Sequence, residues 1–294
     1  MPIEFLDSSE GRKVAQSFDS PTVYLDHWAI RLFSDDRALQ DRLLASLLVK
    51  RGTLLVSIIT MAELGAASDP RHIIDAEAFL ERCLPHLFLS DFRLDEVLAR
   101  ERHEPSNATR FWPTANLGQL KLFGERSQAA GQAFTLKGLA QMAYEHRTPI
   151  NKIMRDNARK MIEAVGKARA DPDYVRKARD APLDDSRTRT SLILGELLRG
   201  FILDSNASMS ENDAVDLIHA AMPLNCCDYV LLDGPWAERV AKMNLRLTKS
   251  SMVMPIAQCF SRRNDGINAF LTDLETFDPQ SRPPPPRRLL RNAK

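Results

Sequence analysis

The sequence has few cysteines and no long apolar run, and both absences narrow the class of protein. Its 294 residues include four cysteines, which form neither a CxxC pair nor a Cys/His spacing typical of zinc ligands. A disulfide scaffold, a structural zinc site and a secreted protein are therefore disfavoured. No stretch approaches the ~20 consecutive apolar residues of a membrane helix, and the first residues form no export signal. We expect a reduced, cytoplasmic protein with no membrane partner.

The chain as a whole also lacks an excess of charge of one sign. Its 40 basic and 39 acidic side chains leave a formal net charge of +1, and hydrophobic residues make up 44%, which is typical of a globular protein. Basic residues are instead concentrated in the middle, where Arg147–Arg199 contains 13 of them against eight acids. This local excess favours a surface that faces nucleic acid. The first candidate phosphate contacts, at helical spacing, are Arg155, Arg159 and Lys160.

Strand-like and helix-like patterns alternate at both ends of the chain. This alternation predicts right-handed βαβ units, and hence an α/β protein with a parallel sheet in a three-layer α/β/α fold. The predicted strands are residues 21–26, 53–59 and 228–233, with a further strand or two within 245–254. Helices are predicted from 27 to 48, from 60, from 211 to 222 and from 236 to 243.

The middle of the chain has a different pattern. Residues 95–205 are almost wholly helical in character, with long amphipathic runs over 129–144 and 151–170 and an exposed connection over 169–189. We therefore predict a single domain over residues 1–277, with a helical insertion over about 95–205. Residues 278–294 are rich in proline and arginine and predict an extended, mobile tail.

Acidic residues stand where the predicted strands end. Asp26 ends the first strand, Glu63 lies in the first turn of the helix after the second, and Asp233 ends the strand over 228–233. Asp213 and Asp216 are three residues apart and share one face of a helix. The carboxyl ends of parallel strands meet at one edge of a sheet, so these carboxylates should converge on one cleft. Because carboxylates this close need a counter-ion, the sequence predicts a centre for Mg²⁺ or Mn²⁺, which prefer oxygen ligands.

Four ordered segments carry these acids: residues 23–26, 56–64, 212–221 and 227–233. They resemble the four motifs of the PIN domain, the metal-dependent ribonuclease fold of toxin–antitoxin toxins and RNA-processing endonucleases. The resemblance implies an endoribonuclease that hydrolyses RNA phosphodiesters with an activated water. It also implies that the metal-binding catalytic acids are Asp26, Glu63, Asp216 and Asp233, with Asp213 as a fifth ligand or a substitute for Asp216.

One departure from the family pattern leaves other functions open. Trp28 stands two positions after the first acid, where the family usually has a small polar residue. One alternative is therefore a catalytically inactive PIN-like RNA-binding scaffold or regulatory subunit. A phosphatase of the haloacid dehalogenase type needs a second aspartate at this position, which disfavours it. A third alternative is a toxin or defence effector silenced by an inhibitory or regulatory protein partner. The sequence leaves open which nucleic acid is cut and whether the chain forms a homo-oligomer.

Each acid also has a purely structural interpretation. Asp26 could cap the helix that follows it, Asp233 could begin a turn with the Gly-Pro after it, and Glu63 could be a solvated acid near a helix N-terminus. The ordered placement of the whole set favours one shared site. For His219, one turn after Asp216, the sequence favours a structural histidine over a phosphate contact.

Overall fold

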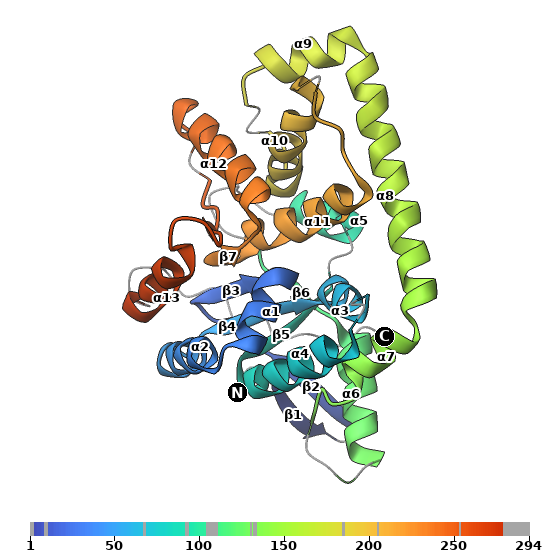
Figure 1. The fold of residues 1–294 in the computed structure, drawn as a ribbon, viewed down its shortest axis with the longest axis vertical. Helices are drawn as coiled ribbons and strands as arrows, with labels where there is room; N and C mark the ends of the chain where they lie inside the picture. The colour runs from blue at the N-terminus through green and yellow to red at the C-terminus, as the bar shows by residue number, and fades with distance from the viewer. Residues whose placement is uncertain are drawn as a thin grey trace.

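A six-stranded sheet forms the centre of the protein in this computed structural model (Figure 1). Five strands run parallel, and only the short edge strand β6 is antiparallel to its neighbour. The α/β class predicted from the sequence is therefore confirmed. In spatial order the strands are β6 (Thr114–Ala115), β5 (Leu87–Asp91), β4 (Thr53–Ser57), β3 (Thr22–Leu25), β7 (Tyr229–Leu231) and β8 (Gln258–Phe260). The structure describes residues 3–8, 11–66, 69–91, 94–103, 111–129, 131, 134–183, 186–204, 206–252 and 254–278.

The strand order reverses direction next to β3. From β3 the chain proceeds outward through β4 to β5, and it later returns to the other side of β3 to add β7 and then β8. Tyr24 of β3 is in register with Leu55 of β4 on one side and Val230 of β7 on the other. In open α/β sheets such a switch point leaves a crevice beyond the carboxyl ends of the strands, and ligands bind there.

The central strands are buried because both faces of the sheet are covered. β3, β4 and β7 have every residue buried, and they read as continuous apolar runs, as strands of a parallel sheet do. One packed helix group comprises α1 (His27–Asp35), α2 (Arg37–Lys50), α4 (Pro70–Cys83) and α13 (Gly266–Thr276). A second comprises α10 (Arg189–Leu203), α11 (Glu211–Cys226) and α12 (Gly234–Lys249). This arrangement is consistent with a three-layer α/β/α fold.

The predicted helical segment over 95–205 is mostly helix where it is described. It contains α5 (Leu94–Glu101), α6 (Leu117–Ala129), α7 (Leu139–Glu145), α8 (Arg147–Ala170), α9 (Pro172–Asp180) and α10, besides the short β6. The long helix α8 follows one side of the molecule from α7 to α9 and packs on α11 (Figure 1). None of the helices in the described part of the chain is both long and apolar enough to cross a membrane.

Two predictions for this segment differ from the structure in part. A helix over 129–144 was predicted, but α6 ends at Ala129 and α7 begins at Leu139, after Gly138 in a left-handed conformation (φ 81°). An exposed connection was also predicted over 169–189; its described residues are mostly exposed, but α9 forms within it and Arg189, at its end, is only 2% exposed. The Arg189 guanidinium donates to Asn225 Oδ1 at 2.7 Å and to the Pro255 carbonyl at 2.6 Å, which ties α10 to the end of α11.

Other boundaries differ from the prediction for local reasons. The predicted helix over 27–48 is two helices, because Asp36 is extended and its carboxylate caps α2 by accepting from the amides of Ala38 and Leu39. The predicted strand over 245–248 is the last part of α12, whose buried residues follow helical spacing up to Leu247. The strand that pairs with β7 on this side is β8.

Several shorter elements complete the fold. The helix after β4 is α3 (Ile58–Gly65), which begins two residues before the predicted start at 60 and is capped by Ser57. A two-stranded antiparallel sheet, β1 (Ile3–Ser8) with β2 (Gly11–Gln16), was not predicted, and a 3₁₀ turn, η1 (Leu84–His86), precedes β5. The predicted tail over 278–294 lies outside the described residues except for Asp278.

Candidate metal centre

Two of the predicted acids follow neighbouring parallel strands. Asp26 comes directly after β3, and Asp233 comes two residues after the end of β7. The Asp26 amide donates to the carbonyl of Leu231 at 3.1 Å, so the ladder between the two strands continues up to the acid. Each acid then caps a helix, Asp26 through His27 N (2.8 Å) and Asp233 through Trp236 N (3.0 Å). Strand pairing therefore places both acids at the switch point.

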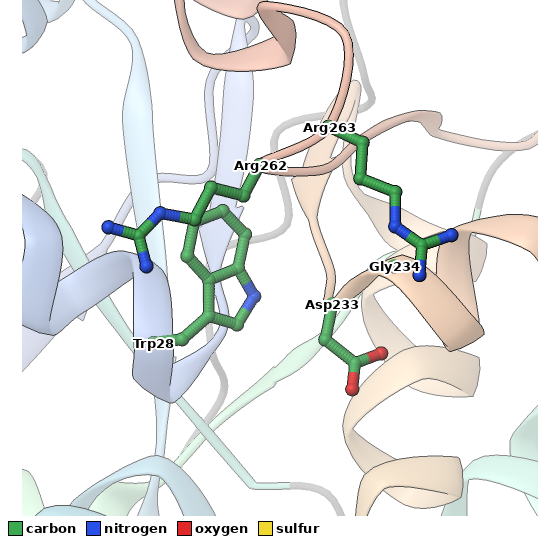
Figure 2. Close-up of a pocket in the computed structure, with 5 residues that line it drawn as sticks. All are labelled: Trp28, Asp233, Gly234, Arg262 and Arg263. Atoms are coloured by element: carbon green, nitrogen blue, oxygen red, sulfur yellow. The ribbon is translucent and has the colours of Figure 1, made fainter.

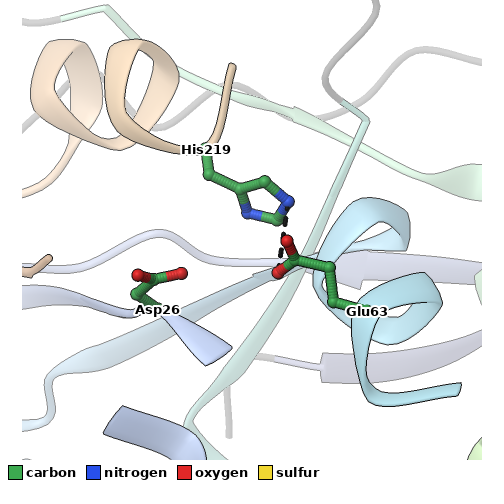
Figure 3. Close-up of side chains that lie close together, drawn as sticks. All are labelled: Asp26, Glu63 and His219. Atoms are coloured by element: carbon green, nitrogen blue, oxygen red, sulfur yellow. Dashed lines mark ion pairs between the residues drawn. The ribbon is translucent and has the colours of Figure 1, made fainter. Parts of the chain in front are cut away.

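Glu63 and His219 reach the same place from two helices (Figure 3). Glu63 lies on α3, which follows β4, and His219 lies on α11, which precedes β7. One ligand atom from each of Asp26, Glu63 and His219 falls within 4.8 Å of the others. His219 Nε2 and Glu63 Oε2 are 3.4 Å apart. Residues separated by almost 200 positions thus form one compact donor set.

The His219 ring is buried, with its side chain only 2% exposed. Its Nδ1 is hydrogen bonded to the hydroxyl of Tyr24, at 2.5 Å. Burial lowers the pKa of His219 to about 3, so the imidazole is neutral near pH 7 and forms no ion pair with Glu63. His219 Nε2 and Glu63 Oε2 are both buried and have no hydrogen-bond partner among the residues that the structure describes.

The pKa values of the acids show that the carboxylates affect one another. Burial, and then the charge of Asp233, raises the pKa of Asp26 to about 6. Burial, followed by Asp26 and Asp233, raises the pKa of Asp216 to about 7. The pKa of Glu63 is raised well above its usual value by burial and by the charges of Asp26 and Asp216. All four acids named as catalytic therefore share one electrostatic environment.

Such a cluster fits a divalent cation. Buried like charges disfavour ionisation unless a positive charge lies among them. Ligands about 2.1 Å from an octahedral ion are about 3 Å apart when adjacent and about 4.2 Å apart when opposite. The separations among Asp26, Glu63 and His219 need only small side-chain adjustments to reach this geometry. The two buried atoms without partners, on Glu63 and His219, are the atoms that such an ion would satisfy.

Asp213 has a clear structural role at the start of α11. Its Oδ2 accepts from the amide and hydroxyl of Ser210, and its own amide donates to Ser210 Oγ, which makes a capping box. Its charge is a minor contribution to the raised pKa of Asp216. It is not part of the group around His219, and its assignment as a metal ligand stays a prediction.

A pocket opens beside Asp233 (Figure 2). Its volume is about 450 Å³, and it is lined by Trp28, Asp233, Gly234, Arg262 and Arg263. Trp28 comes from the first turn of α1, and the two arginines follow β8, so the pocket extends the same carboxyl edge of the sheet. The indole nitrogen of Trp28 is buried without a hydrogen-bond partner among the described residues.

The basic residues predicted to contact phosphate are exposed on α8. Arg159 Nε lies 3.1 Å from Glu211 Oε1, and Arg155 Nε lies 3.9 Å from the other oxygen of the same carboxylate. Glu211 begins α11, five residues before Asp216, so these arginines lie on the flank of the helix that carries two of the cluster residues. Lys160 is exposed next to them.

Comparison of the chain with protein-family models, with curated proteins and with solved structures found no match. Of the four acids that the sequence named, the structure groups Asp26 and Glu63 with His219, and Asp216 and Asp233 act on this group through their charges. The sequence favoured a structural role for His219 and did not point to Arg262 or Arg263. The position of His219 one turn after Asp216 was the one signal available for it.

Proposed function

We propose that this protein is a PIN-like, metal-dependent endoribonuclease that hydrolyses RNA phosphodiesters. One observation carries the proposal: at the switch point of the sheet, ligand atoms of Asp26, Glu63 and His219 lie within 4.8 Å of one another, and the charges of Asp26 and Asp233 act on Asp216. The order of the acids along the chain matches the four motifs of the resemblance. Mg²⁺ and Mn²⁺ are the cations that a carboxylate-rich cluster suits.

Asp26, Glu63, Asp216 and Asp233 would hold the cation. When bound, one or two such ions activate a water and neutralise the charge that develops on the phosphodiester. The helix caps made by Asp26 and Asp233 fix where these two carboxylates lie. Asp216 is oriented by Trp236, whose indole Nε1 donates to Asp216 Oδ2 at 3.3 Å.

The pocket beside Asp233 offers a place for the nucleotide next to the scissile bond. Arg262 and Arg263 supply positive charge for a phosphate, and the ring of Trp28 supplies a face on which a base can stack. On this proposal, Trp28 replaces the small polar residue of the family with a base contact. The exposed basic residues of α8 would extend the contact along the RNA backbone.

The direct test is cleavage of a labelled single-stranded RNA by purified protein in Mg²⁺ or Mn²⁺. Asp26→Asn should lower the cleavage rate by about 100-fold or more, since it removes a charged ligand while keeping the helix cap. Asp36→Asn is the matched control, because Asp36 also caps a helix but lies outside the cluster. EDTA should abolish cleavage by the wild type.

Two outcomes would overturn the proposal. Cleavage that survives both EDTA and Asp26→Asn would exclude the metal mechanism. RNA binding without cleavage in either metal would instead favour the inactive scaffold. If cleavage is confirmed, growth arrest on expression that Asp26→Asn relieves would identify a toxin, and equal growth of both strains would argue against a toxin and its silencing partner.

A further inference from the structure

One member of the cluster is a nitrogen donor in an otherwise carboxylate set. His219 Nε2 lies 3.4 Å from Glu63 Oε2 and belongs to the same group of ligand atoms as Asp26. A histidine that served packing alone would have both ring nitrogens satisfied or excluded from polar surroundings. Here Nδ1 has a partner, whereas Nε2 is buried against carboxylates with no hydrogen-bond partner in the described part of the chain.

The other side of the ring is held by a chain of hydroxyls. Tyr24, which is fully buried in β3, contacts His219 Nδ1 at 2.5 Å and is also hydrogen bonded by Thr60. Thr60 Oγ1 in turn lies 3.2 Å from Ser57 Oγ, the cap of α3. A ligating histidine usually has its second ring nitrogen fixed by such an outer partner, which sets the tautomer and the ring orientation.

We infer that His219 is a direct ligand of the metal centre, through Nε2, and that it makes the centre prefer Mn²⁺ to Mg²⁺. This inference rests on the proposed metal site. In the bound centre, His219 Nδ1–H donates to the Tyr24 hydroxyl, so the Nε2 lone pair faces the ion. Tyr24 is a positioning residue that acts through His219.

The preference follows from ligand chemistry. Mg²⁺ favours oxygen ligands and retains its waters, so a buried imidazole nitrogen adds little to its binding. First-row transition ions bind imidazole more strongly, and among them Mn²⁺ is the one that suits a shell made mainly of carboxylates. A centre with one imidazole and several carboxylates should therefore bind Mn²⁺ more tightly than Mg²⁺, and the difference should depend on His219.

Pulsed EPR of the Mn²⁺-loaded wild-type protein tests the ligand directly. Coupling of the Mn²⁺ electron spin to a directly bound ¹⁴N is expected, and it should change to the ¹⁵N pattern when the protein is grown with [¹⁵N]histidine. This measurement needs no substitution. Loss of the coupling in His219→Gln, but not in His86→Gln, assigns it to one residue. His86 is a matched control because it is buried and bonds the Gly52 carbonyl at the opposite, amino end of β4.

Metal titrations test the preference. His219→Gln should weaken Mn²⁺ binding about 10-fold or more and change Mg²⁺ binding less than about threefold, and Tyr24→Phe should weaken Mn²⁺ binding by about 10-fold while the nitrogen coupling remains. Mn²⁺ that binds the wild type without nitrogen coupling would overturn this inference and leave the nuclease proposal intact. A wild-type protein that binds neither Mn²⁺ nor Mg²⁺ would overturn both.

Discussion

Replacing Asp216 by asparagine is predicted to stabilise the metal-free protein at pH 8. Burial and the charges of Asp26 and Asp233 raise the pKa of Asp216 from 3.8 to about 7. The folded state therefore binds this proton more tightly than the unfolded chain does. The stability that protonation contributes is complete below about pH 4 and is lost as the pH rises through about 7. At pH 8, the wild-type fold holds an ionised carboxylate that its surroundings disfavour.

The size of this stabilisation follows from the same shift in the pKa of Asp216. A pKa raised from 3.8 to about 7 sets an upper limit of about 4 kcal/mol on the cost of ionising Asp216 in the fold. Because the residue is only half-buried and solvent screens its charge, we expect Asp216→Asn to raise the free energy of unfolding by about 1–2 kcal/mol. The asparagine oxygen still accepts from Trp236 Nε1, so little packing is lost.

Urea denaturation in EDTA at pH 4 and pH 8 measures this difference. The gain in the free energy of unfolding of Asp216→Asn should appear at pH 8 and vanish at pH 4, where the Asp216 carboxyl of the wild type is protonated. Asp228→Ala is the control: Asp228 is buried at the other end of β7 and accepts from Thr22 N (2.7 Å) and Thr22 Oγ1 (3.0 Å), so the loss of these bonds should destabilise the protein by about 1–3 kcal/mol. An Asp216→Asn variant that is less stable than the wild type at pH 8 would refute the electrostatic reasoning.

Further predictions concern metal and RNA. Because Asp26 and Asp216 have pKa values of about 6 and 7, Mn²⁺ affinity should rise at least about 10-fold from pH 5.5 to pH 8 in a calorimetric titration, and a flat profile would argue against these ligands. Trp28→Ala should weaken the binding of single-stranded RNA about 5- to 10-fold more than Trp28→Phe, as measured by fluorescence anisotropy, and equal losses would exclude base stacking. In the double variant Arg262→Ala/Arg263→Ala, the slope of log RNA affinity against log salt concentration should become shallower by up to about two. An unchanged slope would show that the pocket does not contact RNA phosphates.

The sequence predicted the parts of the fold that depend on local pattern. β3 and β4 are continuous apolar runs, so both were located within one or two residues. β5 was missed although its Leu87-Phe88-Leu89 run is as apolar as β4, whereas β8 is partly exposed and is recognised by its pairing with β7. The break at Asp36 was missed because helical spacing resumes at Leu39, whereas the Asp36 carboxylate accepts two amides and begins a second helix.

The acids of the site were predictable for a topological reason, whereas the histidine was not. Residues that follow adjacent parallel strands must lie at one edge of the sheet, so naming Asp26 and Asp233 required only the strand assignments. The role of His219 depends on which way its ring faces. That orientation is set by Tyr24, which is 195 positions away in the sequence and becomes a neighbour only when α11 packs over β3. No spacing rule links the two residues.

The structural and functional interpretations of the strand-end acids are compatible. Asp26 uses Oδ1 to cap α1, and Asp233 uses Oδ1 to cap α12, so each carboxylate is fixed by one oxygen and keeps a second for a cation. An alanine at either position removes a helix cap, at a cost of about 1 kcal/mol, together with the charge. Asparagine keeps the capping oxygen and removes the charge alone. Loss of metal binding in the asparagine variants therefore reports on the site itself, because the helices that build it remain capped.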